Sequence, residues 1–165
     1  MNIKTYEPKY CQQVYHLFYE TVHKINQKDY NKKQLDSWAP LTTDLKKWCQ
    51  SLLDNYTIVI ESNETTEKTN NKKIIGFGDI TKEGYLNRLY VHKDHNGKGI
   101  GTLLANELET HAISLGLLEI TTHASITAKP FFEKRGYKLI TKQTVERNGQ
   151  QLINYVMKKQ TKNTP

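Results

Sequence analysis

Residues 89–102 read LYVHKDHNGKGIGT, an apolar strand pattern followed by a loop with three glycines at alternate positions. Apolar residues then recur at helical spacing from residue 103 to residue 115, so the loop leads into the N-terminus of a helix. Such an end carries unpaired amides and about half a positive charge, and glycine lets an anion approach the backbone closely. With Lys98 as an added cation, the loop from Asn96 to Gly101 is predicted to bind a phosphate group.

The spacing of these glycines excludes two common phosphate loops. A Walker loop requires G-x-x-x-x-G-K-[ST], and a dinucleotide fingerprint requires G-x-G-x-x-G with an acid about 20 residues later. Neither pattern is present. Taken alone, the three glycines fit a tight strand-to-helix turn without a ligand equally well, so the rest of the chain decides.

A second segment, SITAKPFFEKRGY at 125–137, follows the next predicted strand. A short helix is expected from Ala128 to Arg135, with Thr127 as its cap and Gly136 behind it. The Phe131-Phe132 pair by itself indicates no more than core packing.

Together the two segments resemble the GNAT superfamily of N-acetyltransferases. Gly99 and Gly101 match the small positions of the pattern [Q/R]-x-x-G-x-[G/A], while Asn96 stands where the family has Gln or Arg. Residues 125–137 resemble the family's N-x-x-A-x-x-F-Y-x-x-x-G-F, in the same order and at a similar distance. The resemblance covers residues 56–158 and also suits the helical N-terminal region.

The resemblance implies an α/β (α+β) fold: a mixed, mostly antiparallel sheet of about seven strands with flanking helices, its fourth and fifth strands splayed near Leu89 and His123. Hydrophobic periodicity places strands at 1–6, 57–60, 73–80, 85–92, 117–124, 137–147 and 151–158. Helices are expected around 14–25, 30–37, 45–53, 103–115 and 128–135, the third capped by Thr42 or Thr43. The polar stretch 62–71 is predicted to be a mobile loop, and Asn148-Gly149 a hairpin turn. We expect a single domain over 1–165, with a flexible tail at 160–165.

Acetyl-CoA is the co-substrate that the resemblance implies, held without a metal. Backbone amides of the fourth strand would bind the pantetheine arm and the thioester carbonyl. The residues expected to bind the co-substrate are Leu89, Tyr90, Val91, Asn96, Gly97, Lys98, Gly99, Ile100, Gly101, Thr102, Ser125, Ala128, Phe131 and Phe132.

In this family an amine attacks the thioester directly in a ternary complex, which requires a neutral amine and a proton for the leaving thiolate. The family's Tyr that supplies this proton is replaced here by Phe132. Tyr155, Tyr30 or water are the substitutes. Asp79 and His123 are the candidate bases, although the residue types somewhat favour a solvent-exposed strand end for Asp79 and a partly buried structural histidine for His123 over catalysis.

The segment from His23 to Pro40 resembles a bacterial GNAT subgroup with an H…Y…Q…W-A-P signature. The resemblance makes His23, Tyr30, Gln34 and Trp38 the wall for a small-molecule amine acceptor. The alternative is a helical hairpin packed on the sheet, with Trp38 in the core.

Composition limits the remaining functions. The chain has 24 Lys and Arg against 17 Asp and Glu, a net charge of +7, but its lysines occur in pairs without a basic block, so a nucleic-acid partner is not favoured. A non-catalytic acyl-CoA sensor and a basic nucleic-acid module stay as alternatives, and a homodimer is left open.

No window approaches the roughly 18 apolar residues of a membrane span, and no signal peptide precedes the first strand. Cys11 and Cys49 are expected to be reduced thiols in a cytoplasmic protein.

Overall fold

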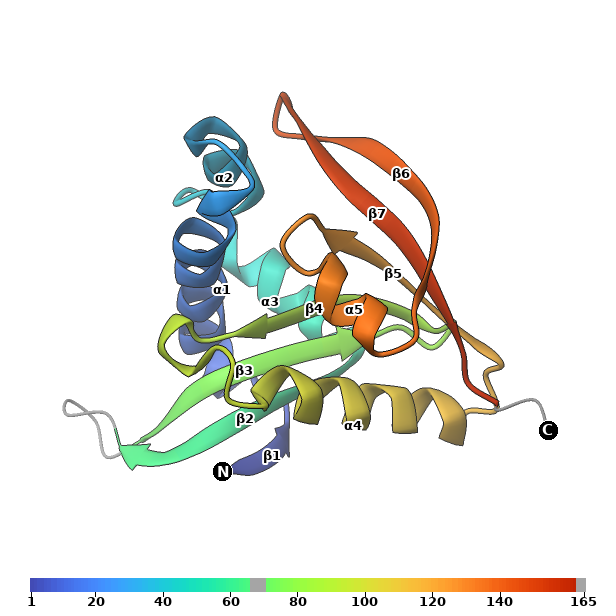
Figure 1. Cartoon of the computed structure of the whole chain (residues 1–165). Helices are drawn as coiled ribbons and strands as arrows, with labels where there is room; N and C mark the ends of the chain where they lie inside the picture. The colour runs from blue at the N-terminus through green and yellow to red at the C-terminus, as the bar shows by residue number, and fades with distance from the viewer. Residues whose placement is uncertain (66–70, 163–165) are drawn as a thin grey trace.

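The computed structural model describes residues 1–65 and 71–162. Within them, seven strands form one sheet in the order β1-β2-β3-β4-β5-β7-β6 (Figure 1). The strands are β1 (Asn2–Thr5), β2 (Tyr56–Thr65), β3 (Lys72–Ile80), β4 (Tyr85–Val91), β5 (Glu119–Ser125), β6 (Lys138–Arg147) and β7 (Gln150–Gln160). The α-helices are α1 (Cys11–Ile25), α2 (Lys32–Trp38), α3 (Leu45–Leu53), α4 (Ile100–Ser114) and α5 (Lys129–Lys134). Only β4 and β5 pair in parallel, so the predicted mixed and mostly antiparallel sheet is confirmed.

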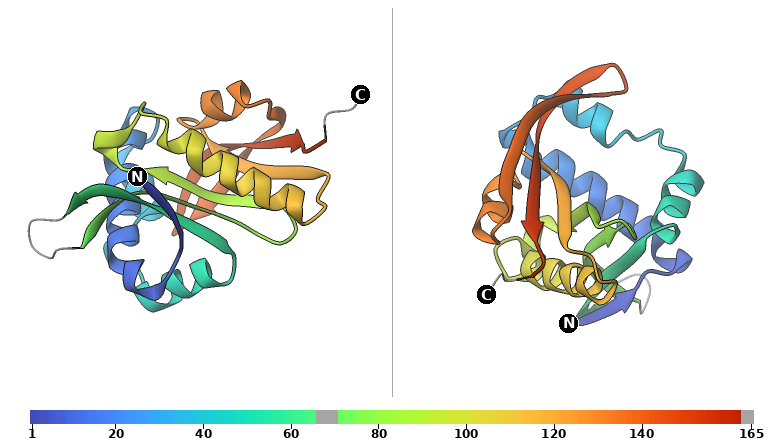
Figure 2. Two further views of the ribbon diagram at one scale, coloured as in Figure 1. Left: turned by 90° about the horizontal axis from the view of Figure 1, so that it is seen from below. Right: turned by 90° about the vertical axis from the view of Figure 1, so that its right-hand side faces the viewer.

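Helices cover both faces of the sheet (Figures 1 and 2). The apolar stripe of α1 packs with α2 and α3 against Phe77 and Val59, whose side chains point to one face. On the other face, α4 and α5 pack against Ile58, Ile75 and Ile120. Alternate residues of β2 and β3 therefore enter different cores, which explains the unbroken apolar runs at 58–60 and 74–77.

The splayed pair of strands is confirmed. β4 and β5 pair only at Tyr85 with Thr121 and at Leu86 with Thr122, and the Thr122 hydroxyl donates to the Leu86 carbonyl at 2.9 Å. Beyond Leu86 the two strands separate. The gap opens toward the glycine loop and is the feature that positions the site.

The β6–β7 hairpin forms the edge of the sheet beyond β5, and its tip lies near α2 (Figure 2). Asn148 and Gly149 have φ angles of 45° and 79°, as a two-residue type I′ turn requires, so the predicted turn is confirmed. The Asn148 side chain donates to the Ser37 carbonyl at 2.8 Å, and the Gln34 side chain donates to the Gln151 carbonyl at 2.9 Å. The hairpin and α2 thus close one end of the gap.

Several local predictions are wrong. Residues 62–65 continue β2 and Thr65 pairs with Lys72, so the predicted loop is shorter, and its residues 66–70 lie outside the described residues. β7 extends to Gln160, and Thr161 donates from its amide to the Leu118 carbonyl at 3.0 Å, so the chain is still held where a tail was expected. Residues 163–165 lie outside the described residues.

Two predicted helix caps are also wrong. Asp44, not Thr42 or Thr43, caps α3 by accepting from the Lys47 amide at 3.2 Å. Thr127 does not cap α5, whose N-cap residue is Ala128, and the Thr127 hydroxyl instead donates to the Asp29 carboxylate at 2.7 Å. In both cases the first helical residue decides the cap: α3 begins at Leu45 and α5 at Lys129, so Asp44 and Ala128 occupy the cap positions.

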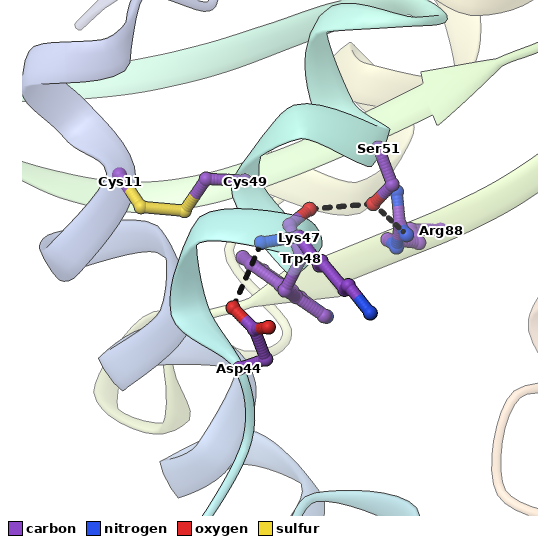
Figure 3. The surroundings of a disulfide bond; sticks show 7 residues. All are labelled: Cys11, Asp44, Lys47, Trp48, Cys49, Ser51 and Arg88. Carbon is purple, nitrogen blue, oxygen red and sulfur yellow. Dashed lines mark hydrogen bonds between the residues drawn. A yellow bond between two sulfur atoms is a disulfide. The ribbon is translucent and has the colours of Figure 1, made fainter.

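The prediction of two reduced thiols is wrong as well. Cys11, at the start of α1, and Cys49, in α3, form a disulfide with a Cα–Cα distance of 5.7 Å (Figure 3). The two residues are 38 positions apart, and only the packing of α1 beside α3 brings them together. No described helix has the length and apolar character needed to cross a membrane.

Candidate active site

The backbone of the 96–101 loop adopts conformations that favour glycine. Gly97 and Gly99 have φ angles of 74° and 82°, and a Cβ at either position would meet no atom within 4 Å. Backbone conformation, not lack of space, therefore requires glycine. Gly99 caps α4, whose first internal hydrogen bond runs from the Leu103 amide to the Gly99 carbonyl at 3.1 Å. The amides of residues 100–102 precede that bond and have no partner inside the helix.

Position 101 requires a small residue for a different reason. A Cβ there would lie 3.4 Å and 3.6 Å from two ring atoms of Phe131 and 3.7 Å from the Val91 side chain. The third glycine thus lets α4 approach α5 and β4 closely. These three elements meet at one wall of a cavity.

The cavity has a volume of about 600 Å³ and lies along the gap between β4 and β5. Its lining includes twelve residues predicted to bind the co-substrate: Leu89, Tyr90, Val91, Asn96, Gly97, Gly99, Gly101, Thr102, Ser125, Ala128, Phe131 and Phe132. Two predicted residues do not line it. Lys98 lies outside, and the Ile100 side chain is buried in the core beneath α4, so Ile100 contributes at most its amide.

Backbone amides of β4 also face the gap. The His92 amide donates to the Ile75 carbonyl of β3 at 2.8 Å, and amides of an antiparallel strand point to alternate sides. The amides of Val91 and Leu89 therefore point away from β3, toward the space that β5 leaves. Hydrogen-bond donors in that position suit an extended amide chain or a carbonyl oxygen.

His123 is the candidate base that lines this cavity. Its ring lies 5.0 Å from the ring of Tyr85, and its Nδ1 lies 3.4 Å from the Gln143 side chain. Partial burial lowers the pKa of His123, and the positive charge of Arg147 lowers it further. The imidazole is consequently neutral near pH 7 and able to accept a proton.

Asp79 lies outside the cavity, in a buried polar network on the α3 side of the sheet. Its side chain is fully buried and pairs with Arg88 at 2.7 Å, while Asn55 donates to the same oxygen at 2.8 Å. Burial raises the pKa of Asp79, and Arg88 opposes that rise. Arg88 in turn donates to Ser51 at 2.7 Å and lies over the Trp48 ring (Figure 3). Asp79 is thus neither the solvent-exposed strand end considered above nor a neighbour of the cavity.

Tyr155 does not line the cavity either. It packs partly buried on the α5 side of the sheet, with the Lys129 ammonium 5.1 Å from its ring centre. No described group of three or more His, Cys, Asp or Glu side chains is placed to hold a metal ion.

Comparison with known proteins is consistent with this geometry. The model of the acetyltransferase (GNAT) domain family matches residues 26–159, most of the chain. The chain belongs to the GNAT acetyltransferase family. It is 28% identical over 159 residues to an uncharacterized N-acetyltransferase, YafP, of Escherichia coli (strain K12), covering 96% of this chain and 95% of that one.

Solved GNAT structures agree. A GCN5-related N-acetyltransferase from Rhodopseudomonas palustris superposes with a TM-score of 0.86 at 30% identity, covering 96% of this chain and 94% of that one. The PaiA N-acetyltransferase from Thermoplasma acidophilum, in complex with coenzyme A, shares the fold with a TM-score of 0.72 at 18% identity, over 97% and 99% of the two chains.

Phe132 is where this GNAT chain departs from the family's F-Y pair. Its side chain is 4% exposed, lines the cavity and packs edge-on against Phe131 and Tyr137, with ring centres 5.2 Å and 5.0 Å apart. The residue serves the core and the cavity wall together. It offers no proton.

The predicted acceptor wall divides into two pairs. Trp38 and Tyr30 line cavities, Trp38 the large one and both a smaller recess. His23 and Gln34 do not: His23 contacts Tyr19 and Asp36, and Gln34 completes the capping box of α2 and donates to β7. An acceptor-binding role for these four residues stays a prediction, and the geometry favours it only for Trp38 and Tyr30.

Tyr30 is fixed by its hydroxyl group. The hydroxyl donates to the Ile153 carbonyl at 2.6 Å and accepts from the Ile126 amide at 3.0 Å. Its proton is therefore committed to the backbone, and it is a poor donor to a leaving thiolate.

The recess also contains residues that the sequence analysis did not select, namely Tyr85, Asn87, Arg147 and Asn154. Arg147 and Asn154 lie on opposite strands of the hairpin, and no motif distinguishes them from other polar residues of an amphipathic strand. The Asn-Gly turn predicts the hairpin but does not single out these two residues, since Arg147 pairs with Gln150 and Asn154 with Gln143.

Proposed function

We propose that the chain transfers an acetyl group from acetyl-CoA to the amine of a small-molecule acceptor, by direct attack in a ternary complex. The observation that carries this proposal is the continuity of the cavity. It begins at unpaired amides that suit a pyrophosphate, passes the inward-facing amides of β4 and reaches His123. Family membership and the likeness to GNAT structures solved with coenzyme A or acetyl-CoA support the same co-substrate.

Each part of the gap has a separate task in this mechanism. The loop amides hold the pyrophosphate, and the amides of Leu89 and Val91 hold the pantetheine arm and polarise the thioester carbonyl. His123, neutral near pH 7, accepts the proton of the acceptor ammonium or of the attacking amine. The amine nitrogen forms a bond to the carbonyl carbon, the C–S bond breaks, and the thiolate leaves.

The thiolate then takes its proton from water. With Phe132 in place of the family's Tyr and the Tyr30 proton donated to the backbone, neither side chain supplies it. A thiol has a pKa of about 8.5, so water protonates the departing group readily at neutral pH.

An acyl-CoA sensor without catalysis is the second candidate, and Phe132 is the observation that favours it. Release of free coenzyme A thiol, measured with a panel of small amines and confirmed by mass of the acetylated product, separates the two. Turnover that falls in His123→Ala, while a Tyr155→Phe control retains it, supports the enzyme. Binding of acetyl-CoA without thiol release from any amine supports the sensor.

A further inference from the structure

A small recess continues the large cavity at the end remote from the glycine loop. It has a volume of about 80 Å³ and shares Trp38, Asn87, Tyr90, His123 and Ser125 with the large cavity. Residues of the β6–β7 hairpin close its other side. A recess of this volume holds several water-sized groups, so a compact polar group suits it.

The charged side chains that line the recess and the large cavity are positive. No Asp or Glu lines the recess or the large cavity within the described chain. Arg147 lines the recess, and its side chain forms no hydrogen bond or ion pair with any described residue. Its charge acts on the site, because it lowers the pKa of His123, Tyr85 and Tyr90. Arg88 nearby is already neutralised by Asp79.

Asn154 supplies a second unused group in the same recess. Its Oδ1 atom is buried and has no hydrogen-bond partner in the described chain. An unpaired buried oxygen costs free energy unless a ligand donates to it. Arg147 and Asn154 both line the recess and share one face of the hairpin, so the recess wall carries a cation and an unpaired hydrogen-bond acceptor.

We infer that the acceptor is a small amine that also carries a carboxylate, an amino-acid-type molecule, with its carboxylate paired to Arg147 and a polar N–H donating to Asn154. This inference rests on the proposed function. The guanidinium fork matches a carboxylate in two parallel hydrogen bonds, and the neutral His123 stands beside the amine. Polyamines and aminoglycosides carry several positive charges, which Arg147 repels and no cavity carboxylate balances.

Matched acceptors test the inference directly. Each amino acid is compared with its carboxamide and with its decarboxylated amine, and coenzyme A release gives kcat/KM for the wild type, Arg147→Gln and Lys142→Gln. Lys142 is an exposed cation of the same hairpin that does not line the recess, so its variant removes equal charge elsewhere. We expect the wild type and Lys142→Gln to favour the carboxylated member by tenfold or more. Arg147→Gln should lose that preference through a raised KM.

Other results would overturn the inference. Equal or better use of the decarboxylated amines by the wild type would do so, as would an Arg147→Gln variant that slows every acceptor to the same extent. If no amine releases thiol, the proposed function fails instead. Calorimetry then still tests the inference by measuring how the amino acids and their carboxamides bind to the coenzyme A complex. If Arg147→Gln loses the preference for the carboxylated ligand and Lys142→Gln keeps it, the inference is supported.

Discussion

Phe132 stands where the F-Y pair of the family motif places a Tyr hydroxyl. If water protonates the thiolate, Phe132→Tyr adds an unneeded but harmless donor. We expect coenzyme A binding to stay nearly unchanged and turnover not to fall, measured by steady-state kinetics and thermal shift. A loss greater than about tenfold, or roughly 1.4 kcal/mol of barrier, would show that the wall beside Phe132 tolerates no hydroxyl.

His123 should give the acid limb of the pH profile. Only its neutral form accepts a proton, so kcat/KM should rise as pH increases through a pKa below the ordinary value of about 6.5. Besides burial, the charged group that lowers this pKa is Arg147, while Tyr85 facing it is neutral in this range. Arg147→Gln should therefore move the limb to higher pH.

The control for this profile is Lys142→Gln, which should leave the limb in place. The rise of kcat/KM with pH would belong to another group if its midpoint did not move in Arg147→Gln, or if the rise persisted in His123→Ala.

Asp79 and Arg88 form a pair whose role we expect to be structural. Asp79→Ala leaves the Arg88 charge, only 16% exposed, without its partner, and such losses cost about 3–5 kcal/mol of unfolding free energy. Replacing Arg88 with Met in the same background should recover part of the loss. Chemical denaturation measures both, with the exposed Asp54→Ala as control. An Asp79→Asn protein of normal stability without turnover would instead make Asp79 catalytic.

At the scale of elements, the link between α1 and α3 is covalent. The Cys11–Cys49 disulfide closes a loop of 38 residues, which by loop-closure entropy stabilises the folded protein by roughly 3–4 kcal/mol. A reductant should lower the melting temperature of the wild type and have no effect on a Cys11→Ser/Cys49→Ser protein. Two reactive thiols in the denatured, unreduced wild type would contradict the disulfide.

The β6–β7 hairpin and α2 act together as one wall, although more than a hundred residues separate them. The side chains of Asn148 and Gln34 form hydrogen bonds between the hairpin and α2. Tyr30, just before α2, donates its hydroxyl proton to β7. These bonds position Arg147 over the recess. The recess is thus assembled from segments that lie more than a hundred residues apart in the sequence.

At the scale of the molecule, coenzyme A should stabilise the fold by mass action. At a hundredfold excess over Kd the gain is about 2.7 kcal/mol, which for a chain of this size corresponds to roughly 5–10 °C in melting temperature. Gly99→Val should abolish this shift, because a β-branched residue resists the φ of 82° that forms the loop.

Gly116→Val is the matched control. Gly116 has a φ of 75° and open space around its Cβ position, but it follows the opposite end of α4. Both variants should melt lower than the wild type for the same reason. Only Gly99→Val should lose the coenzyme A shift, and a shift retained there would move the site elsewhere.

What the sequence alone determined is mostly local. The order of strands and helices, the Asn148-Gly149 turn and the glycine loop follow from periodicity and backbone preference, which neighbouring residues set. The resemblance to the GNAT family added the prediction that the fourth and fifth strands separate. The N-cap positions Asp44 and Ala128 were not predicted, because periodicity does not locate the first residue of a helix to the single position.

Tertiary structure alone decided which polar groups meet. It joined Cys11 to Cys49, removed Asp79 from the cavity by pairing it with Arg88, and brought Arg147 and Asn154 to one recess. Asp79 and Arg88 face each other across β3 and β4, and Arg147 and Asn154 share one face of the β6–β7 hairpin, but only the packing of the surrounding elements decides whether such residues line a cavity or enter a core. The energy of a disulfide, an ion pair or a ligand contact depends on distance in space, and that distance exists only after the two cores have packed.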